Sequence, residues 1–161
     1  TYPLPEAQLD RFMMMLKVDY PSADEEREIV KQTTVAVNQD LQKLLSPEEI
    51  MKYQNLVLKV PAADPVIRLA VDIVRASRPN DESASADVKQ YVAFGAGPRA
   101  AQHLVLAGKA RALLNGRPAV DGEDIRALAH PVLRHRILTN FHAEARNVST
   151  DDIINLLFRQ P

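Results

Sequence analysis

Apolar residues recur at helical spacing along much of the chain. The clearest stripe consists of Val66, Leu69, Ala70, Ile73 and Val74. Such a stripe is typical of an amphipathic helix that packs one face on a core. Asp64-Pro65 supplies a start signal and Arg78-Pro79 a stop, because proline fits the first turn of a helix and disfavours helix in the residue before it. The pattern predicts a helix that ends near Ser77.

Polar residues that cap helices mark two further starts. Ser22 and Glu25 have the spacing of a capping box, which predicts a helix over residues 23–33. Ser46-Pro-Glu-Glu49 combines a cap, a proline and a glutamate. The apolar positions that follow it at helical spacing are Ile50, Tyr53, Leu56 and Val57. Residues 38–45, between the two helices, remain ambiguous.

The C-terminal part contains similar signals. Asp121-Gly-Glu-Asp124 places acidic residues in the first turn of another helix, where they suit the helix dipole. Pro131 should kink or end that helix. Ser149-Thr-Asp-Asp152 predicts a last helix over residues 153–158. The polar residues 80–87 predict an exposed loop, and residues 88–92 a short extended segment.

The most unusual helix start is Phe94-Gly-Ala-Gly-Pro-Arg-Ala-Ala101, which leads into a helix that Asn115-Gly116 should end. Pro98 suits the first helical position, and the glycines before it allow a tight turn. Arg99 then lies at the positive end of the helix dipole, a mildly unfavourable place for a cation. Two interpretations remain open. The helix start binds an anion such as phosphate, or Arg99 pairs with a nearby carboxylate.

The first twenty residues differ in character from the rest. Residues 5–12 predict a proline-started helical turn, at the end of which Asp10 and Arg11 would form an exposed ion pair. Residues 13–18, Met-Met-Met-Leu-Lys-Val, form a short apolar run before Tyr20-Pro21, which favours a strand. Because a strand needs a sheet, this segment resembles the trailing end of another domain. The remainder predicts a mostly α fold, a helical bundle.

Composition narrows the functional classes. The net charge of −1 gives no bulk electrostatic reason to bind nucleic acid or an anionic membrane. Because the chain has no cysteine, it offers no disulfide, no thiolate nucleophile and no thiolate metal site, which suits a cytoplasmic protein. The apolar runs are shorter than the roughly 20 residues of a membrane span. The abrupt start without an initiator methionine suggests a fragment of a longer protein.

The motifs of a complete nucleotide site are missing from the sequence. The Gly-Lys pair, Gly108-Lys109, is followed by Ala110 and precedes no Ser or Thr, so it is not a P-loop (Walker A motif). No apolar strand ends in Asp-Glu, as a magnesium-binding Walker B strand does. The four histidines show no metal-binding spacing. Surface or interface roles are expected for them, and no metal site.

Five motifs, in this order along nearly the whole chain, resemble the MoxR family of AAA+ ATPases. They are Thr1-Tyr-Pro-Leu-Pro-Glu-Ala-Gln-Leu-Asp-Arg-Phe12, Ala76-Ser-Arg78, Gly95-Ala-Gly-Pro-Arg-Ala100, Ala119-Val-Asp-Gly-Glu-Asp-Ile125 and Ala129-His-Pro-Val-Leu-Arg-His-Arg136. The resemblance implies that residues 1–21 are the remnant of an α/β nucleotide-binding core. Residues 22–161 would then be the helical lid domain.

The resemblance also implies roles for single residues. Arg11 matches the arginine finger, which reaches the γ-phosphate held by the neighbouring subunit. Arg99 matches the sensor 2 arginine, which acts on nucleotide in its own subunit, with Gly97 and Pro98 beside it at the binding site. The family commonly has serine where this chain has Gly97, so the cap of the helix should be looser.

The function implied is that of a ring-forming ATPase, commonly hexameric, that remodels or matures client proteins and works beside von Willebrand factor A-domain proteins. ATP and Mg²⁺ would be cofactors of the full-length protein, whereas residues 1–161 alone should be inactive and bind neither tightly. The alternative is a helical DNA-binding or regulatory module of a AAA+ relative. In that case residues 121–136 would be the recognition helix, with Arg126, Arg134 and Arg136 as its cations. A structural interaction domain without a nucleotide role is the third option.

Overall fold

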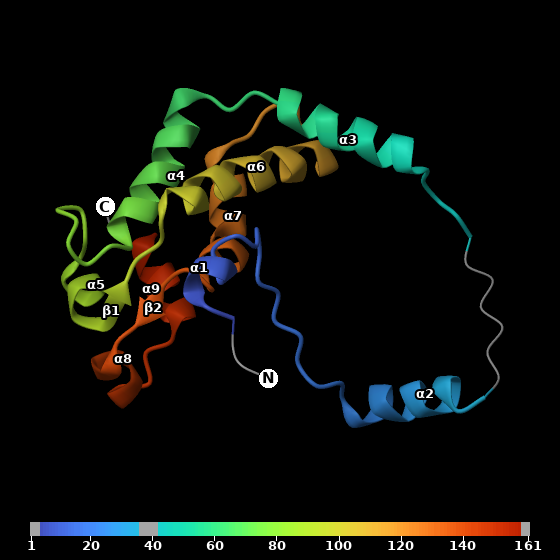
Figure 1. Ribbon diagram of the computed structural model, residues 1–161, viewed down its shortest axis with the longest axis horizontal. Coiled ribbons are helices and arrows are strands. Elements are labelled where there is room, and N and C mark those ends of the chain that lie inside the picture. The colour runs from blue at the N-terminus through green and yellow to red at the C-terminus, as the bar shows by residue number, and fades with distance from the viewer. Residues whose placement is uncertain (1–3, 36–41, 159–161) are drawn as a thin grey trace.

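Helices dominate the computed structural model, which describes residues 4–35 and 42–158 (Figure 1). The elements in chain order are α1 (Glu6–Leu9), α2 (Ala23–Thr33), α3 (Pro47–Lys59), α4 (Asp64–Ala76), α5 (Ala86–Tyr91), β1 (Val92–Phe94), α6 (Pro98–Leu114), α7 (Gly122–Leu133), β2 (Leu138–Thr139), α8 (Phe141–Ala145) and α9 (Thr150–Leu157). The mostly α fold predicted from the sequence is confirmed.

The longest helix, α6, forms the centre of the molecule. It packs against α4 and α7, while α7 contacts α9 and α5 contacts α8. The largest fully buried apolar side chains come from these elements and their connections: Val74, Val88, Leu104, Ile125, Val132, Leu133, Ile137, Ile153 and Ile154. The strands β1 and β2 pair antiparallel. They tie the chain before α6 to the chain after α7.

Most predicted helix starts are confirmed by their caps. Ser22, Ser46, Asp121 and Ser149 each form a capping box with the residue three positions on. The helix after Gly97 begins at Pro98, and Gly116, just past its end, has a φ of 69°, as expected for a glycine after a helix. The capping residues therefore predicted the starts of these helices correctly.

Two predicted extended segments are wrong. Residues 13–18 form no strand, and Met15 N–H instead donates a hydrogen bond to Pro131 O at 2.8 Å. No strand lies beside this run within the described residues, so it has no ladder to join. Residues 86–91 are helical because Ser85 caps them and places Val88 and Tyr91 in the core. Only Val92, at the end of the predicted segment, belongs to a strand.

Smaller differences lie at helix ends. Pro131 lies inside α7, which continues to Leu133 because Val132 and Leu133 are fully buried, and their packing outweighs the missing backbone hydrogen bond. The helix α8 and the strand β2 were not predicted from the sequence. Of the ambiguous stretch 38–45, residues 42–45 have no regular structure and the others lie outside the described residues.

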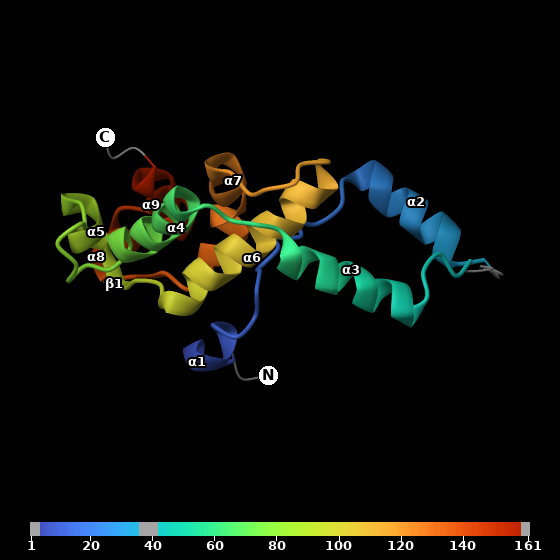
Figure 2. The same ribbon diagram turned by 90° about the horizontal axis from the view of Figure 1, so that it is seen from above.

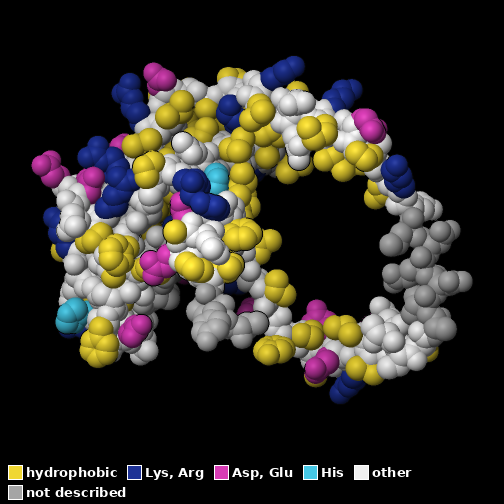
Figure 3. All heavy atoms as spheres, viewed as in Figure 1, with side chains coloured by type: hydrophobic (Ala, Val, Ile, Leu, Met, Phe, Trp, Pro, Cys, Tyr) yellow, Lys and Arg dark blue, Asp and Glu magenta, His cyan; other side chains and the backbone are white. Residues whose placement is uncertain are grey.

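The helix α3 contacts α6, whereas α2 extends away from the rest of the molecule (Figure 2). None of their residues is buried, although each helix has apolar side chains. Ile29, Val30, Ile50, Tyr53 and Leu56 are all exposed, and Figure 3 shows apolar side chains along the inner rim between the two helices. Among the described residues, no helix is both long enough and apolar enough to cross a membrane.

The loop before α6 lies very close to the end of α4. A Cβ atom on Gly95 would lie 2.4 Å from Ser77 O, so only glycine fits without a shift of the backbone. Ser77 Oγ accepts a hydrogen bond from Ala96 N–H at 2.9 Å, and Arg78 Nε donates one to Ala96 O at 2.9 Å. The start of α6 is thereby fixed on the end of α4.

We predict that Gly95→Ala destabilises the chain whereas Gly97→Ser does not. The added methyl group at Gly95 would collide with backbone atoms and lower the free energy of unfolding by about 1–3 kcal/mol. The space beside Gly97 is open, and a serine there would cap α6 and add about 0.3 kcal/mol. Chemical denaturation of both variants measures the difference. Equal stability of the two would contradict the close contact between Gly95 and Ser77.

Candidate functional site

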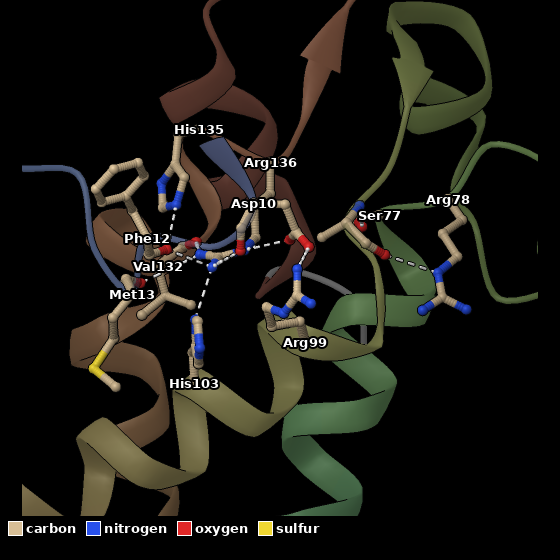
Figure 4. A network of polar contacts seen from close by, with 11 residues as sticks. Asp10, Phe12, Met13, Ser77, Arg78, Arg99, His103, Val132, His135 and Arg136 are labelled. Carbon is tan, nitrogen blue, oxygen red and sulfur yellow. Dashed lines mark hydrogen bonds and ion pairs between the residues drawn. The ribbon is translucent and has the colours of Figure 1, made fainter. Parts of the chain in front are cut away.

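The N-terminal half of α6, the end of α7 and the segment that follows α1 meet at one polar cluster (Figure 4). Arg99 and His103 are four residues apart on α6 and therefore lie on the same face of the helix. Arg136 follows α7 by three residues. Asp10 comes directly after α1. These side chains point toward one another, although Asp10 and Arg136 are 126 residues apart in sequence.

Asp10 lies between two guanidinium groups. Its Oδ2 accepts from Arg99 Nη1 at 2.6 Å and its Oδ1 accepts from Arg136 Nε at 2.9 Å. Burial alone would raise the pKa of the Asp10 carboxyl, but the hydrogen bonds and charges of Arg136 and Arg99 outweigh it and lower the pKa. The predicted ion pair between Asp10 and Arg11 is wrong, because the Asp10 carboxylate pairs with Arg99 and Arg136 instead.

Arg136 is the buried member of the cluster, with 1% of its side chain exposed. Besides Asp10 Oδ1, its guanidinium donates to Asp10 O at 2.8 Å, to Phe12 O at 2.6 Å and to Val132 O. Burial lowers the pKa of Arg136, and the hydrogen bond from Arg136 to Asp10 and the charge of Asp10 oppose that shift. The Arg136 side chain thus binds the main chain on both sides of Arg11.

Two histidines complete the cluster as neutral groups. His103 Nδ1 lies 2.7 Å from Arg136 Nη2, and since a guanidinium only donates, Nδ1 accepts and carries no proton. Burial and then the charge of Arg136 lower the pKa of His103. His135 Nε2 donates to Phe12 O at 2.9 Å, and burial lowers its pKa as well. His135 thus contacts the N-terminal segment directly, whereas His103 contacts Arg136, which binds that segment.

The charges in the cluster do not cancel. Two guanidinium groups share one carboxylate, and the histidines are neutral, so one positive charge is left over. Arg136 is enclosed, whereas 44% of the Arg99 side chain is exposed. The excess charge therefore faces solvent at Arg99. Pairing with a carboxylate and binding an anion, the two interpretations of Arg99, are compatible in this geometry.

The start of α6 offers room beside Arg99. Gly97 is the N-cap and forms no side-chain hydrogen bond, and Pro98 follows as the first helical residue. The first turn of α6 contains no acidic residue, and apart from the adjacent residues no atom lies within 4 Å of a Cβ position at Gly97. A cation beside the open start of a helix suits a phosphate group.

Arg11 is exposed, and its side chain forms no hydrogen bond or ion pair with the residues 4–35 and 42–158. Only its main chain is fixed, by a hydrogen bond from Arg11 N–H to Gln8 O at 3.1 Å. The structure does not pair Arg11 with Arg99 directly. The two are connected through Asp10, the residue before Arg11.

Known proteins resemble the chain over most of its length. Residues 84–157 match the model of the AAA lid domain. The chaperone MoxR1 of Mycobacterium tuberculosis is 37% identical over 96% of this chain, and MoxR of Paracoccus denitrificans is 35% identical over 91%. A crystal structure of a candidate ATPase from Cytophaga hutchinsonii superposes on 99% of the chain with a TM-score of 0.89 and 34% identity.

The chain belongs to the MoxR family of AAA+ proteins. It spans 41% and 46% of the two MoxR relatives and 49% of the solved structure, so it corresponds to less than half of each. The family match identified from the five motifs is confirmed, and the region 84–157 is a AAA lid.

The sequence did not predict that Asp10, His103 and Arg136 form one cluster with Arg99. Asp10 and Arg136 lie inside two of the motifs that resemble the MoxR family, so that motif pattern was the available signal. Their contact joins opposite ends of the chain, and no local pattern predicts it. Within the described residues, no group of acidic or histidine side chains is arranged to hold a metal ion.

Arg136 and Arg99 should differ sharply in their effect on stability. We predict that Arg136→Met lowers the free energy of unfolding by about 1.5–3 kcal/mol, because hydrogen bonds from a charged group to buried acceptors are lost. Arg99→Met should cost less than about 1 kcal/mol, because its ion pair is partly exposed and screened. Urea denaturation of the two variants tests this order. A larger loss of unfolding free energy in Arg99→Met than in Arg136→Met would contradict the conclusion that Arg136 stabilises the fold and Arg99 contributes little to it.

Proposed function

We propose that the chain is the lid-containing part of a MoxR-like ATPase that couples ATP hydrolysis to the remodelling or maturation of client proteins. In this proposal Arg99 acts as the sensor 2 residue on nucleotide in its own subunit. The observation that carries it is the excess positive charge at Arg99, beside the open start of α6. Among the cations of the cluster, Arg99 is the exposed one.

The chemistry that Arg99 would serve is phosphoryl transfer. Negative charge spreads over the γ-phosphate oxygens in the transition state, and a fixed guanidinium stabilises that charge. Because Arg99 is part of α6, and α6 packs on α4 and α7, a shift of Arg99 would be transmitted to the helices of the lid. Loss of the γ-phosphate would then change the position of the lid, which is the motion that acts on a client.

We assign Arg11 as the arginine finger that acts on the nucleotide of the neighbouring subunit. Its exposure and the absence of a side-chain partner among the described residues support this role. Arg136 anchors the main chain on both sides of Arg11, so the exposed side chain extends from a fixed base. Such an arrangement would make hydrolysis depend on ring assembly.

The full-length protein would supply the remaining parts. ATP and Mg²⁺ would be bound mainly by a P-loop and a Walker B strand that this sequence does not contain, so residues 1–161 alone should be inactive. Residues 1–21 would complete the α/β core, with residues 22–161 as the lid. A cytoplasmic homo-oligomeric ring of six subunits, as the family resemblance implies, and a von Willebrand factor A-domain partner belong to the same proposal.

The DNA-binding alternative finds little support in the structure. Of its three cations, Arg134 is paired with Asp151 at 2.9 Å and Arg136 is buried. Neither guanidinium is available to a DNA phosphate, and phosphate contacts supply most of non-specific DNA affinity. Residues 121–136 therefore serve the packing of the lid.

We predict that Arg11→Ala and Arg99→Ala each lower ATP turnover by the full-length protein by about 100-fold or more, with ATP binding affected less. The matched control is Arg27→Ala, because Arg27 is an exposed arginine on α2 paired only with Asp24 among the described residues. Steady-state kcat and KM of the assembled protein measure the effect. Wild-type turnover in the Arg99 variant would remove its sensor role.

Mixing subunits separates the two arginines. If Arg11 acts on the neighbour's nucleotide, an Arg11→Ala subunit should regain turnover at its own site when its neighbour supplies a wild-type Arg11. Arg99→Ala should show no such recovery, because it acts within its own subunit. Recovery of both variants, or of neither, would contradict the assignment.

A further inference from the structure

One carboxylate, that of Asp10, connects the two arginines of the proposed function. It forms an ion pair with Arg99 and directly precedes Arg11 in the chain. We propose that Asp10 is a positioning residue that holds Arg99 away from the nucleotide until a γ-phosphate competes for the guanidinium. This inference rests on the proposed function, because it assigns a regulatory contact to the same site.

Of the two guanidinium groups on Asp10, Arg99 is the one that can leave. Arg136 is enclosed and, in addition to the Asp10 carboxylate, donates to four main-chain carbonyls, those of residues 10, 12, 13 and 132. Arg99 has a single side-chain contact within the described part of the chain, from Nη1 to Asp10 Oδ2 at 2.6 Å. Its side chain is partly exposed, so water can replace the lost contact.

Departure of Arg99 leaves a balanced pair behind. Asp10 would keep Arg136, one negative and one positive charge, and the excess positive charge would move with Arg99. A γ-phosphate carries more negative charge than a single carboxylate and offers three oxygens. The phosphate therefore wins the competition when ATP is present. After the γ-phosphate is lost, Arg99 forms the ion pair with Asp10 again.

The ion pair between Asp10 and Arg99 would also affect the position of Arg11. Arg136 donates to Asp10 O and to Phe12 O, the carbonyls that flank Arg11, and to the Asp10 side chain. The Asp10 carboxylate and the main chain of Arg11 are thus bound by one rigid guanidinium. When Arg99 binds or leaves Asp10, the interaction between Asp10 and the Arg136 guanidinium changes. The position of the Arg11 main chain, which Arg136 holds, changes with it.

The decisive variant is Asp10→Asn in the full-length ATPase. Without the carboxylate, Arg99 is free before ATP arrives, so the KM for ATP should fall by about threefold, the value of one partly exposed ion pair. The inhibition constant of ADP, which lacks the γ-phosphate, should fall less. A merely structural role of Asp10 predicts the opposite sign, a raised KM, because the site would be distorted.

Three further variants make the result specific. Asp72→Asn, on the exposed face of α4, should leave KM unchanged. In the background of Arg99→Ala, Asp10→Asn should no longer lower KM, because the competing group is gone. If thermal melting shows that Asp10→Asn does not fold, Asp10→Glu is measured instead. It keeps the charge and should have a KM at or above that of the wild type.

The two proposals fail in different ways. If the wild-type full-length protein does not hydrolyse ATP, or if Arg99→Ala turns over normally, the proposed function is wrong. If both behave as expected but Asp10→Asn leaves the KM unchanged or raises it, only the positioning role of Asp10 is wrong. A KM below the wild-type value in Asp10→Glu would also overturn it.

Discussion

The buried guanidinium of Arg136 is the interaction on which the arrangement of the site depends. A charge removed from water must be neutralised and hydrogen-bonded, or it costs several kcal/mol. Arg136 meets this requirement with Asp10 and with carbonyls of residues 10, 12 and 132. The segment after α1 has no strand partner among the described residues. It is placed on the lid by this cation and by the hydrogen bonds of His135 and Met15.

The same requirement leaves Arg99 incompletely neutralised. Asp10 has two oxygens, and Arg136 occupies one while Arg99 contacts the other. A guanidinium that shares its carboxylate, at the start of a helix whose N-cap has no side chain, has the features that suit an anion such as phosphate. The ion pair between Arg99 and Asp10 therefore does not argue against a phosphate-binding role for Arg99. The buried arginine gives stability, and the exposed one remains available.

The helices were predictable because their signals are local. Ser22, Ser46, Asp121 and Ser149 cap helices through residues only three positions away. Residues 13–18 were not predictable in this way, because an apolar run forms a strand only beside another strand. The cluster around Asp10 was beyond local reasoning too, since Arg99, His103 and Arg136 are brought to it by the packing of α6 and α7. Family resemblance pointed to Arg11 and Arg99, but not to the carboxylate between them.

The most direct test of the central claim is a structure of the full-length protein with Mg²⁺ and a non-hydrolysable ATP analogue. The predicted result is that Arg99 has left Asp10 and lies within hydrogen-bond distance of the γ-phosphate, while Arg136 still contacts Asp10. Arg99 still paired with Asp10, with the analogue bound in the same subunit, would contradict it.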